Sequence, residues 1–140
     1  MKALDTNILA RYYVDDPGDP EAAKQRPLAR QIILGGSRLF VPLTVLLELE
    51  WVLRAFYGFE PGAFTGVVHH LLGMSNISVE QWPRVVDALE VHEQGLDFSD
   101  ALHLMGSAHC EAMYSFDDQK FARRVKRLGI KPEVIVPADH

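Results

Sequence analysis

Short, largely apolar runs of three or four residues recur along the chain, and a longer segment with helical spacing of apolar residues follows each of them except the last. Runs of this length are typical of buried strands, whereas apolar residues three or four positions apart indicate helices. Strands that alternate with helices predict an α/β fold with a mostly parallel sheet. A chain of 140 residues is long enough to form one such domain with a full core.

The segments can be placed by their apolar patterns and by the residues that end them. The predicted strands are Lys2–Leu4, Leu39–Val41, Ile77–Val79, Met113–Phe116 and Val134–Val136. The predicted helices are Thr6–Tyr13, Pro20–Leu34, Thr44–Tyr57, Pro61–Leu72, Gln81–Glu93, Ser99–Cys110 and Asp118–Leu128. Pro27 should bend or divide the second helix, and glycines 58, 95 and 129 stand where helices should end. Because no repeat or long linker interrupts this pattern, we expect residues 1–140 to form a single domain.

Charge and composition restrict the class of protein. The net charge of −5 argues against a surface that coats nucleic acid, although the stretch from Gln119 to Lys131 holds basic residues and no acid. The single cysteine excludes an internal disulfide. Asp5 and Arg11 interrupt the first apolar stretch too early for a signal peptide, and no apolar run could span a bilayer. We therefore expect a cytoplasmic protein without a membrane segment.

Two aspartates directly follow predicted strands. In open α/β sheets, binding sites form beyond the carboxyl ends of the strands, and Asp5 and Asp117 are both in that place. Asp5 could instead cap the following helix, but Thr6 or Asn7 could do that equally well. Both interpretations of Asp5, a helix cap and a ligand, stay open at this point.

Two glutamates share the predicted helix that ends at Tyr57. Glu50 has Arg54 four residues later, so we expect an ordinary ion pair at the surface. Glu48 has mainly apolar residues at helical neighbour spacing and no local cation. A carboxylate in such surroundings is costly unless a distant partner or a metal neutralises it, so Glu48 is a candidate ligand.

The remaining acids stand at helix starts. Asp97 and Asp100 are three residues apart, so Asp97 could cap a helix and Asp100 could lie in its first turn. We assign Asp100 to the site. Asp117 is nearer the strand than Asp118, so we assign Asp117 to the site and Asp118 to the cap. Carboxylates brought together by one α/β topology would repel one another, and a hard divalent cation such as Mg²⁺ would remove that repulsion.

The segments LDTNILARYYVDDP, VPLTVLLELEWVLRAFY, GLDFSDALHL and YSFDDQKFARR together resemble the PIN-domain ribonucleases, and within them the VapC toxins of bacterial toxin–antitoxin pairs. The segments occur in the family's order and extend over essentially the whole chain. The resemblance implies a PIN-like three-layer α/β/α fold with a central, mostly parallel sheet flanked by helices.

The same resemblance implies roles for individual residues. Asp5, Glu48, Asp100 and Asp117 would be the catalytic acids that hold Mg²⁺ or Mn²⁺, with Thr6 and Ser115 in support and Asp97 in a secondary role. The implied activity is that of an endoribonuclease toxin, in which a metal-activated water attacks the RNA phosphodiester in line. The implied partners are an RNA substrate, a cognate antitoxin and a second copy of the chain.

Other groups keep two interpretations. The basic residues Lys120, Arg124, Arg127 and Lys131 lie on one helical stripe, either as a solvated face or as contacts to RNA phosphates. We expect the aromatic residues Trp51, Phe56, Tyr57, Phe59, Phe64 and Trp82 to build core or a dimer face rather than to stack on bases.

Two other functions compete with the nuclease. One is a PIN-like module that binds RNA or protein without cleavage. The other is a phosphatase with an aspartyl nucleophile, whose DxDx[TV] signature needs a second aspartate where this chain has Asn7.

Overall fold

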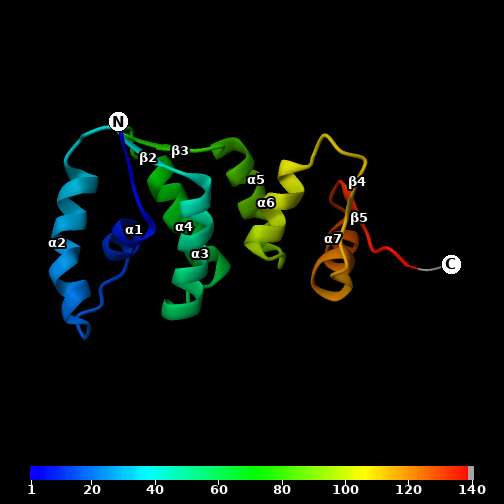
Figure 1. The fold of residues 1–140 in the computed structure, drawn as a ribbon, viewed down its shortest axis with the longest axis horizontal. Helices are drawn as coiled ribbons and strands as arrows, with labels where there is room; N and C mark the ends of the chain where they lie inside the picture. Colours follow the sequence, from blue (N-terminus) through cyan, green and yellow to red (C-terminus); the bar gives the residue numbers. More distant parts are fainter. Residues whose placement is uncertain (139–140) are drawn as a thin grey trace. The chain divides into compact units, whose positions relative to one another are not determined.

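A computed structural model describes residues 1–138 of the chain (Figure 1). The chain forms two compact units, Met1–Gln81 and Trp82–His140, and each is described by itself. Within the described residues, no helix is both long enough and apolar enough to cross a bilayer.

The first unit is built on a parallel sheet. Its strands are β1 (Lys2–Ala3), β2 (Leu39–Val41) and β3 (Ile77–Val79), and β2 lies between the other two. Leu39 is opposite both Lys2 and Ile77. Ile77 and Val79 are buried while Ser78 between them is exposed, as expected for side chains that alternate between the two faces of a sheet. The strands agree with the predicted ranges, apart from β1, which ends one residue earlier.

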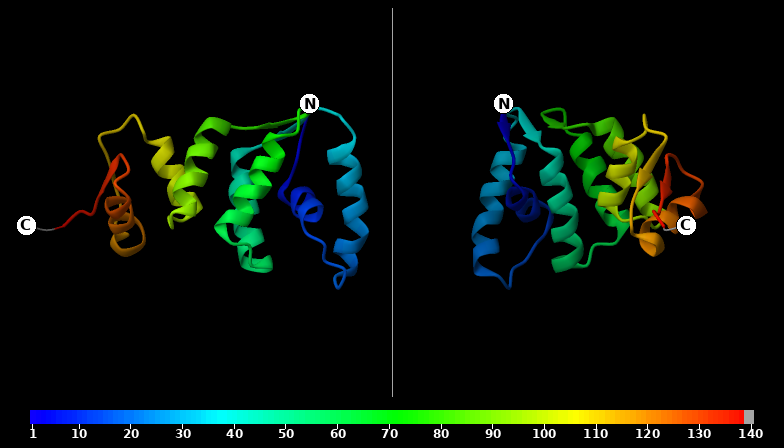
Figure 2. Two further views of the ribbon diagram at one scale, coloured as in Figure 1. Left: turned by 180° about the vertical axis from the view of Figure 1, so that it is seen from behind. Right: turned by 45° about the vertical axis from the view of Figure 1, so that its right-hand side comes forward.

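Four helices connect and cover these strands. They are α1 (Thr6–Tyr13), α2 (Pro20–Leu34), α3 (Leu43–Tyr57) and α4 (Pro61–Leu72). Helix α1 packs against both α2 and α3, and α4 packs against β3 (Figures 1 and 2). Because β1 leads straight into α1 and β2 leads straight into α3, the starts of these two helices both lie beyond the carboxyl ends of their strands.

Pro27 lies inside α2, which continues through it from Pro20 to Leu34. Of the two predicted effects of Pro27, division of the helix does not occur, and a bend stays a prediction. The two halves are kept in one helix because Ala22, on one side of the proline, and Ala29 and Ile33, on the other, are all buried. Their packing, with the side-chain cap that Asp19 gives to the amino end, offsets the hydrogen bond that proline cannot donate.

The second unit begins with a pair of packed helices, α5 (Trp82–Glu93) and α6 (Phe98–Gly106). It continues with β4 (Ala112–Tyr114), the π-helical segment η1 (Asp118–Ala122), α7 (Arg123–Leu128) and β5 (Glu133–Ile135). Strands β4 and β5 pair in parallel, and η1 and α7 form the crossover that packs on β5 (Figure 1). The guanidinium of Arg124 donates to the carbonyl of Gly95 at 3.0 Å, which ties α7 to the loop between α5 and α6.

The predicted α/β class with parallel strands is confirmed, because every strand pair in the described residues is parallel and is joined through helices. Helices α3 and α5 each start one residue away from the predicted position, and β4 and β5 each start one residue earlier than predicted. Two other predicted helices differ further. The one expected at Ser99–Cys110 ends at Gly106, and the one expected at Asp118–Leu128 starts as a π-helical turn, in which Ala122 N–H donates to the carbonyl of Asp117 at 3.1 Å.

Candidate metal centre

Asp5 is the amino-terminal cap of α1. It has extended backbone angles, φ −85° and ψ 163°, and its Oδ1 accepts the backbone N–H of Thr6 at 2.8 Å. The alternative in which Thr6 or Asn7 caps this helix is therefore wrong. The cap uses one carboxylate oxygen, and Asp5 is exposed, so Oδ2 is placed to bind a ligand from solvent.

Thr6 links Asp5 to Glu48. The Thr6 side chain is buried, with 5% of its surface exposed, and its hydroxyl donates a hydrogen bond to Oε1 of Glu48 on α3. The backbone of Thr6 thus binds one carboxylate while its side chain binds the other. This arrangement follows from the fold, because α1 packs on α3 and both helices start at the carboxyl end of a strand.

A cleft of about 470 Å³ opens beside these carboxylates. Asp16 and Asp19 also line the cleft. Asp19 caps α2, and the Tyr57 hydroxyl donates a hydrogen bond to Asp16 at 3.4 Å. The cleft is lined by Asp5, Thr6, Asn7, Ala10, Arg11, Asp16, Asp19, Glu48, Val52, Phe56 and Tyr57. It is therefore predominantly acidic.

One cation in the cleft was missed by the sequence analysis. Arg11 Nε donates to Gln25 at 2.9 Å, and Arg11 Nη1 donates to the Tyr57 hydroxyl at 3.4 Å. Gln25 in turn is held by Glu21 at 2.8 Å. These partners lie far from Arg11 in the sequence, so spacing alone gave no signal that this arginine would face the acids.

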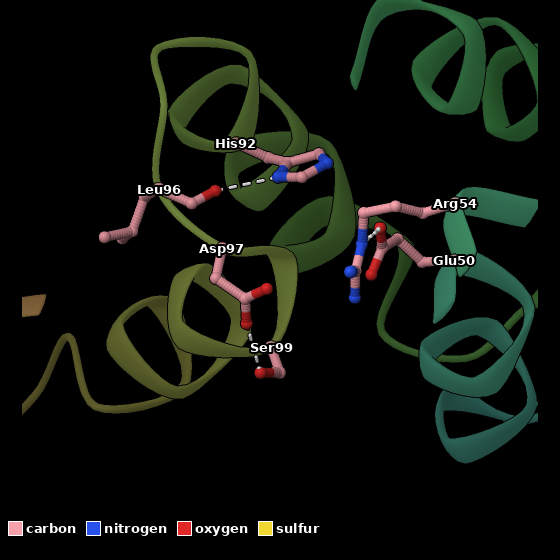
Figure 3. Close-up of polar contacts among 6 residues, drawn as sticks. All are labelled: Glu50, Arg54, His92, Leu96, Asp97 and Ser99. Atoms are coloured by element: carbon pink, nitrogen blue, oxygen red, sulfur yellow. Dashed lines mark hydrogen bonds and ion pairs between the residues drawn. The ribbon is translucent and has the colours of Figure 1, made fainter. Parts of the chain in front are cut away.

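The exposures of the two glutamates on α3 are the reverse of those expected. Glu48 is exposed, whereas only 5% of Glu50 is exposed, so the expectation that Glu50 lies at the surface was wrong. The predicted pair of Glu50 and Arg54 is confirmed, with Nε to Oε2 at 2.9 Å (Figure 3). Burial of the Glu50 carboxylate requires this partner, because an unpaired charge would be costly there.

In the second unit, Asp97 stands at the amino-terminal cap position of α6, but its side chain makes no capping hydrogen bond. Its Oδ2 instead accepts the hydroxyl of Ser99 at 2.6 Å (Figure 3). The backbone carbonyl of Asp97 accepts the N–H of Ala101 at 2.8 Å, so the helix begins normally without the carboxylate.

Asp100 lies in the first turn of α6 and is half-buried. Burial raises the pKa of the Asp100 carboxyl above its usual range, and the negative charges of Asp97 and Asp117 raise it further. His103 and Arg124 act in the opposite direction on the same pKa without reversing its rise. Asp97 and Asp117 therefore both act electrostatically on Asp100, and a cation beside Asp100 would lower the cost of ionising it.

Asp117 caps η1, since its Oδ1 accepts the N–H of Lys120 at 3.0 Å. The assignment of the cap to Asp118 was therefore wrong, and Asp118 pairs with Arg123 at 2.8 Å instead. Ser115 Oγ accepts the N–H of Asp117 at 3.0 Å, which fixes the backbone where the aspartate leaves the strand. Asp117 is exposed, and its Oδ2 is left outside the cap.

The basic stripe on η1 and α7 has mixed roles. Lys120, Arg127 and Lys131 are exposed, whereas Arg124 is half-buried and donates to the carbonyl of Gly95. Arg124 therefore makes a structural contact in addition to any role in binding. Lys120, Arg127 and Lys131 are exposed to solvent.

The aromatic residues also depart in part from expectation. Phe64 is buried in the core as predicted. Trp51, Phe56 and Trp82 are exposed large side chains, so these three do not build core, and the alternative that they form a dimer face stays a prediction. Phe56 also lines the acidic cleft.

The candidate ligands fall into two groups. Asp5, Thr6 and Glu48 lie together in the first unit, and Asp97, Asp100 and Asp117 belong to the second. Within residues 1–138, no group of three or more histidine, cysteine, aspartate or glutamate side chains is placed to hold a metal ion.

Comparison with known proteins gives a match for nearly the whole chain. A family model described as PIN domain matches residues 2–128, a range that includes residues of both units. The chain is also similar to a protein of Aquifex aeolicus described as VapC ribonuclease. The two are 30% identical over 133 residues, which cover 94% of each protein.

Proposed function

This chain belongs to the PIN-domain family, and we propose that it is a metal-dependent endoribonuclease, the toxin of a toxin–antitoxin pair. The observation that carries the proposal is the extent of the similarity, because the family model matches residues 2–128, a range that contains the positions of Asp5, Glu48, Asp100 and Asp117. Asp5 and Asp117 lie beyond the carboxyl ends of β1 and β4, where sites form in α/β folds, which supports the proposal.

We propose that Asp5, Glu48, Asp100 and Asp117 together bind Mg²⁺ or Mn²⁺. The donors fit a hard cation, because carboxylate oxygens are the ligands that Mg²⁺ prefers. The hydrogen bonds of Asp5 and Asp117 each use Oδ1, and that of Glu48 uses Oε1, so each carboxylate keeps a second oxygen for a ligand. The raised pKa of Asp100 supports this proposal, since burial and then the negative charges of Asp97 and Asp117 raise it, and a cation would balance those charges.

The bound cation would supply Lewis-acid chemistry, lowering the pKa of water and stabilising charge on the phosphate during hydrolysis. The residues of this chain have separate tasks around it. Thr6 keeps the Glu48 carboxylate in one orientation by its hydrogen bond. Ser115 holds the backbone of Asp117, and Ser99 holds the carboxylate of Asp97. Fixed carboxylates reduce the reorganisation that hydrolysis would otherwise require.

The proposal includes partners and a location. RNA phosphates would contact the exposed cations Lys120 and Arg127, with Arg124 beside them. A cognate antitoxin would block the acidic site, and the toxin would act as a homodimer in the cytoplasm. Similarity to the Aquifex aeolicus protein over 94% of both chains supports the type of protein and leaves the RNA target open.

The experiment that tests this function is incubation of the purified protein with structured RNA and Mg²⁺. We expect cleavage that leaves 5′-phosphate and 3′-hydroxyl ends, and we expect EDTA or Asp5→Asn to abolish it. Asp118→Asn is the matched control for Asp117→Asn, because it changes the next residue and removes only the pair with Arg123. Binding without cleavage would instead support a noncatalytic RNA-binding module, and release of phosphate from small monoesters would support a phosphatase.

A further inference from the structure

Two exposed aromatic rings lie on α3 beside the acidic cleft. Trp51 is 50% exposed and Phe56 is 67% exposed, although large aromatic side chains are usually buried in a core. Their ring centroids are 5.4 Å apart at an interplanar angle of 86°, so the edge of one ring meets the face of the other. We call Trp51 and Phe56 the aromatic shelf.

The shelf adjoins the candidate metal ligands through the geometry of one helix. Glu48, Val52 and Phe56 are four residues apart and share one face of α3, and Trp51 is three residues after Glu48. Phe56 and Glu48 both line the cleft that also contains Asp5. A group that rests on Phe56 therefore lies at the same cleft as the carboxylates.

We propose that the aromatic shelf binds an unpaired RNA base by stacking, next to the phosphate that is to be cleaved. The identity of the ligand as RNA rests on the function proposed above. The shelf then contributes to the choice of cleavage site, because a base held in a helical stack with its neighbours could not reach it. Trp51 and Phe56 are specificity residues in this proposal and take no part in the hydrolysis.

Charge favours a base as the occupant. The cleft carries four acidic side chains and the whole chain has a net charge of −5, so the phosphates of RNA are repelled from it unless a cation is bound. A neutral base with an open π-face avoids that repulsion, and stacking on aromatic side chains is a general source of affinity for single strands. The aromatic shelf can thus attract RNA by stacking on a base, which the acidic side chains of the cleft cannot do.

The size of the apolar surface argues against a protein as the occupant. Among the exposed large hydrophobic side chains of the described residues, Trp51 and Phe56 are those that belong to α3. The charged side chains of Glu48 and Arg54 are their neighbours on the same helix, and both are exposed. A stable protein interface buries about 800 Å² on each partner, which two rings do not provide.

The test uses Trp51 as its own reporter. The chain has two tryptophans, so Trp82→Phe leaves Trp51 as the single tryptophan, which can be excited selectively over the tyrosines. Asp5→Asn in the same protein keeps the RNA intact in Mg²⁺. A single strand of about 12 nucleotides is titrated in, and so is a strand of equal length and charge that carries abasic riboses. We expect the base-containing strand to quench Trp51 and the abasic strand to leave its emission unchanged. Equal quenching by both would overturn the proposal.

Substitutions then separate stacking from apolar contact. Measured with labelled RNA, Phe56→Leu should weaken binding roughly 5- to 100-fold, because it keeps an apolar side chain but removes the ring. Phe56→Tyr should bind as the parent does. Leu28→Ala is the matched control, since Leu28 is an exposed apolar residue on α2 outside the shelf and the acidic cleft. Unchanged affinity in Phe56→Leu would overturn the proposal.

Two further outcomes distinguish this proposal from the nuclease itself. If the wild-type protein cleaves RNA and the shelf variants bind and cleave it equally well, the nuclease function is supported and the proposal for the shelf is overturned. Quenching by the base-containing strand, together with no cleavage of RNA by the wild-type protein in Mg²⁺, would remove the nuclease and retain the shelf as an RNA-binding surface. A shift from dimer to monomer in Phe56→Leu, with RNA affinity intact, would assign the shelf to a second copy of the chain and overturn the proposal.

Discussion

The hydroxyl of Thr6 donates a hydrogen bond to the carboxylate of Glu48, 42 residues further along the chain. The same residue gives its backbone N–H to Asp5 at 2.8 Å, so one threonine orients two carboxylates that the sequence keeps far apart. Thr6 is buried, which shields both bonds from competition with water. The position therefore requires a small side chain that carries a hydroxyl.

Thr6→Val tests that requirement, because valine keeps the shape and removes the donor. We expect the free energy of unfolding to fall by about 1 kcal/mol, the usual net value of one hydrogen bond. We expect a larger effect on metal affinity, about 10- to 100-fold, since residues that orient ligands have effects of that size. Calorimetric titration with Mn²⁺ measures it. Thr6→Ser should restore the affinity, and a serine variant as weak as the valine one would contradict this role.

Asp5 has a structural task and a proposed functional one, and two substitutions separate them. Asn caps helices as well as Asp does, so the free energy of unfolding of Asp5→Asn should stay within a few tenths of a kcal/mol of the parent, whereas Asp5→Ala should lower it by about 0.5–2 kcal/mol. Neither variant should cleave RNA, because neither keeps the carboxylate. Urea unfolding and a cleavage assay on the same samples provide the comparison. Cleavage retained by Asp5→Asn would show that the carboxylate acts only as a cap.

The two glutamates of α3 should respond oppositely to the removal of charge. Glu50→Gln weakens the pair between the buried Glu50 carboxylate and the exposed Arg54, so we expect the free energy of unfolding to fall by about 1–3 kcal/mol. Glu48 is exposed, so Glu48→Gln should cost less than about 1 kcal/mol while abolishing cleavage. Urea unfolding measures the first effect and a cleavage assay the second. A Glu50→Gln protein as stable as the parent would show that the buried Glu50 carboxylate does not depend on its pair with Arg54.

The sequence predicted the ranges of most elements because their signals are local. Apolar spacing and end residues were sufficient for the helices Thr6–Tyr13 and Pro20–Leu34 and for the strand Leu39–Val41. The end of α6 was missed, although Ser107 Oγ donates to the carbonyl of His103 at 2.9 Å and so competes with continuation of the helix. Serine in this role leaves no apolar signature, so the predicted helix ran on to Cys110.

The site was less predictable than the fold, since its details depend on residues distant in sequence. The local neighbours of Glu48 indicated a candidate ligand, but they could not show that Thr6 would be its partner. The assignment of the cap to Asp118 failed because Asp118 is the first residue of the helical segment and pairs with Arg123, while Asp117 before it accepts the N–H of Lys120. Exposure of Trp51 and Phe56 likewise depends on what the rest of the fold covers, which residue type alone does not reveal.

The basic residues of α7 should separate into a structural and a binding contribution. Arg124→Gln removes the hydrogen bond to Gly95 and should lower the free energy of unfolding by about 1 kcal/mol. Arg127→Gln, at an exposed position, should leave stability unchanged and weaken RNA binding at low salt. The slope of log affinity against log salt should fall by about one for each RNA phosphate that the protein no longer neutralises. If Arg127→Gln left the slope of log affinity against log salt unchanged, Arg127 would be a solvent-exposed residue that contacts no RNA phosphate.

The raised pKa of Asp100 predicts that the stability of the metal-free protein falls as the Asp100 carboxyl loses its proton. Its pKa in the folded state is raised by burial and by Asp97 and Asp117, so the folded state holds the proton more tightly than the unfolded state does. Stability contributed by this group is therefore present below the ordinary aspartate pKa and is lost as the pH rises through the raised value. Asp100→Asn should consequently stabilise the protein at neutral pH in EDTA, and the gain should vanish in acid. Thermal unfolding at about pH 3.5 and about pH 7, on either side of this transition, measures the difference, and Asp87→Asn, at an exposed position of α5, is the control. If Asp100→Asn were less stable than the parent at neutral pH without metal, the charged Asp100 carboxylate would stabilise the folded state, which contradicts the prediction.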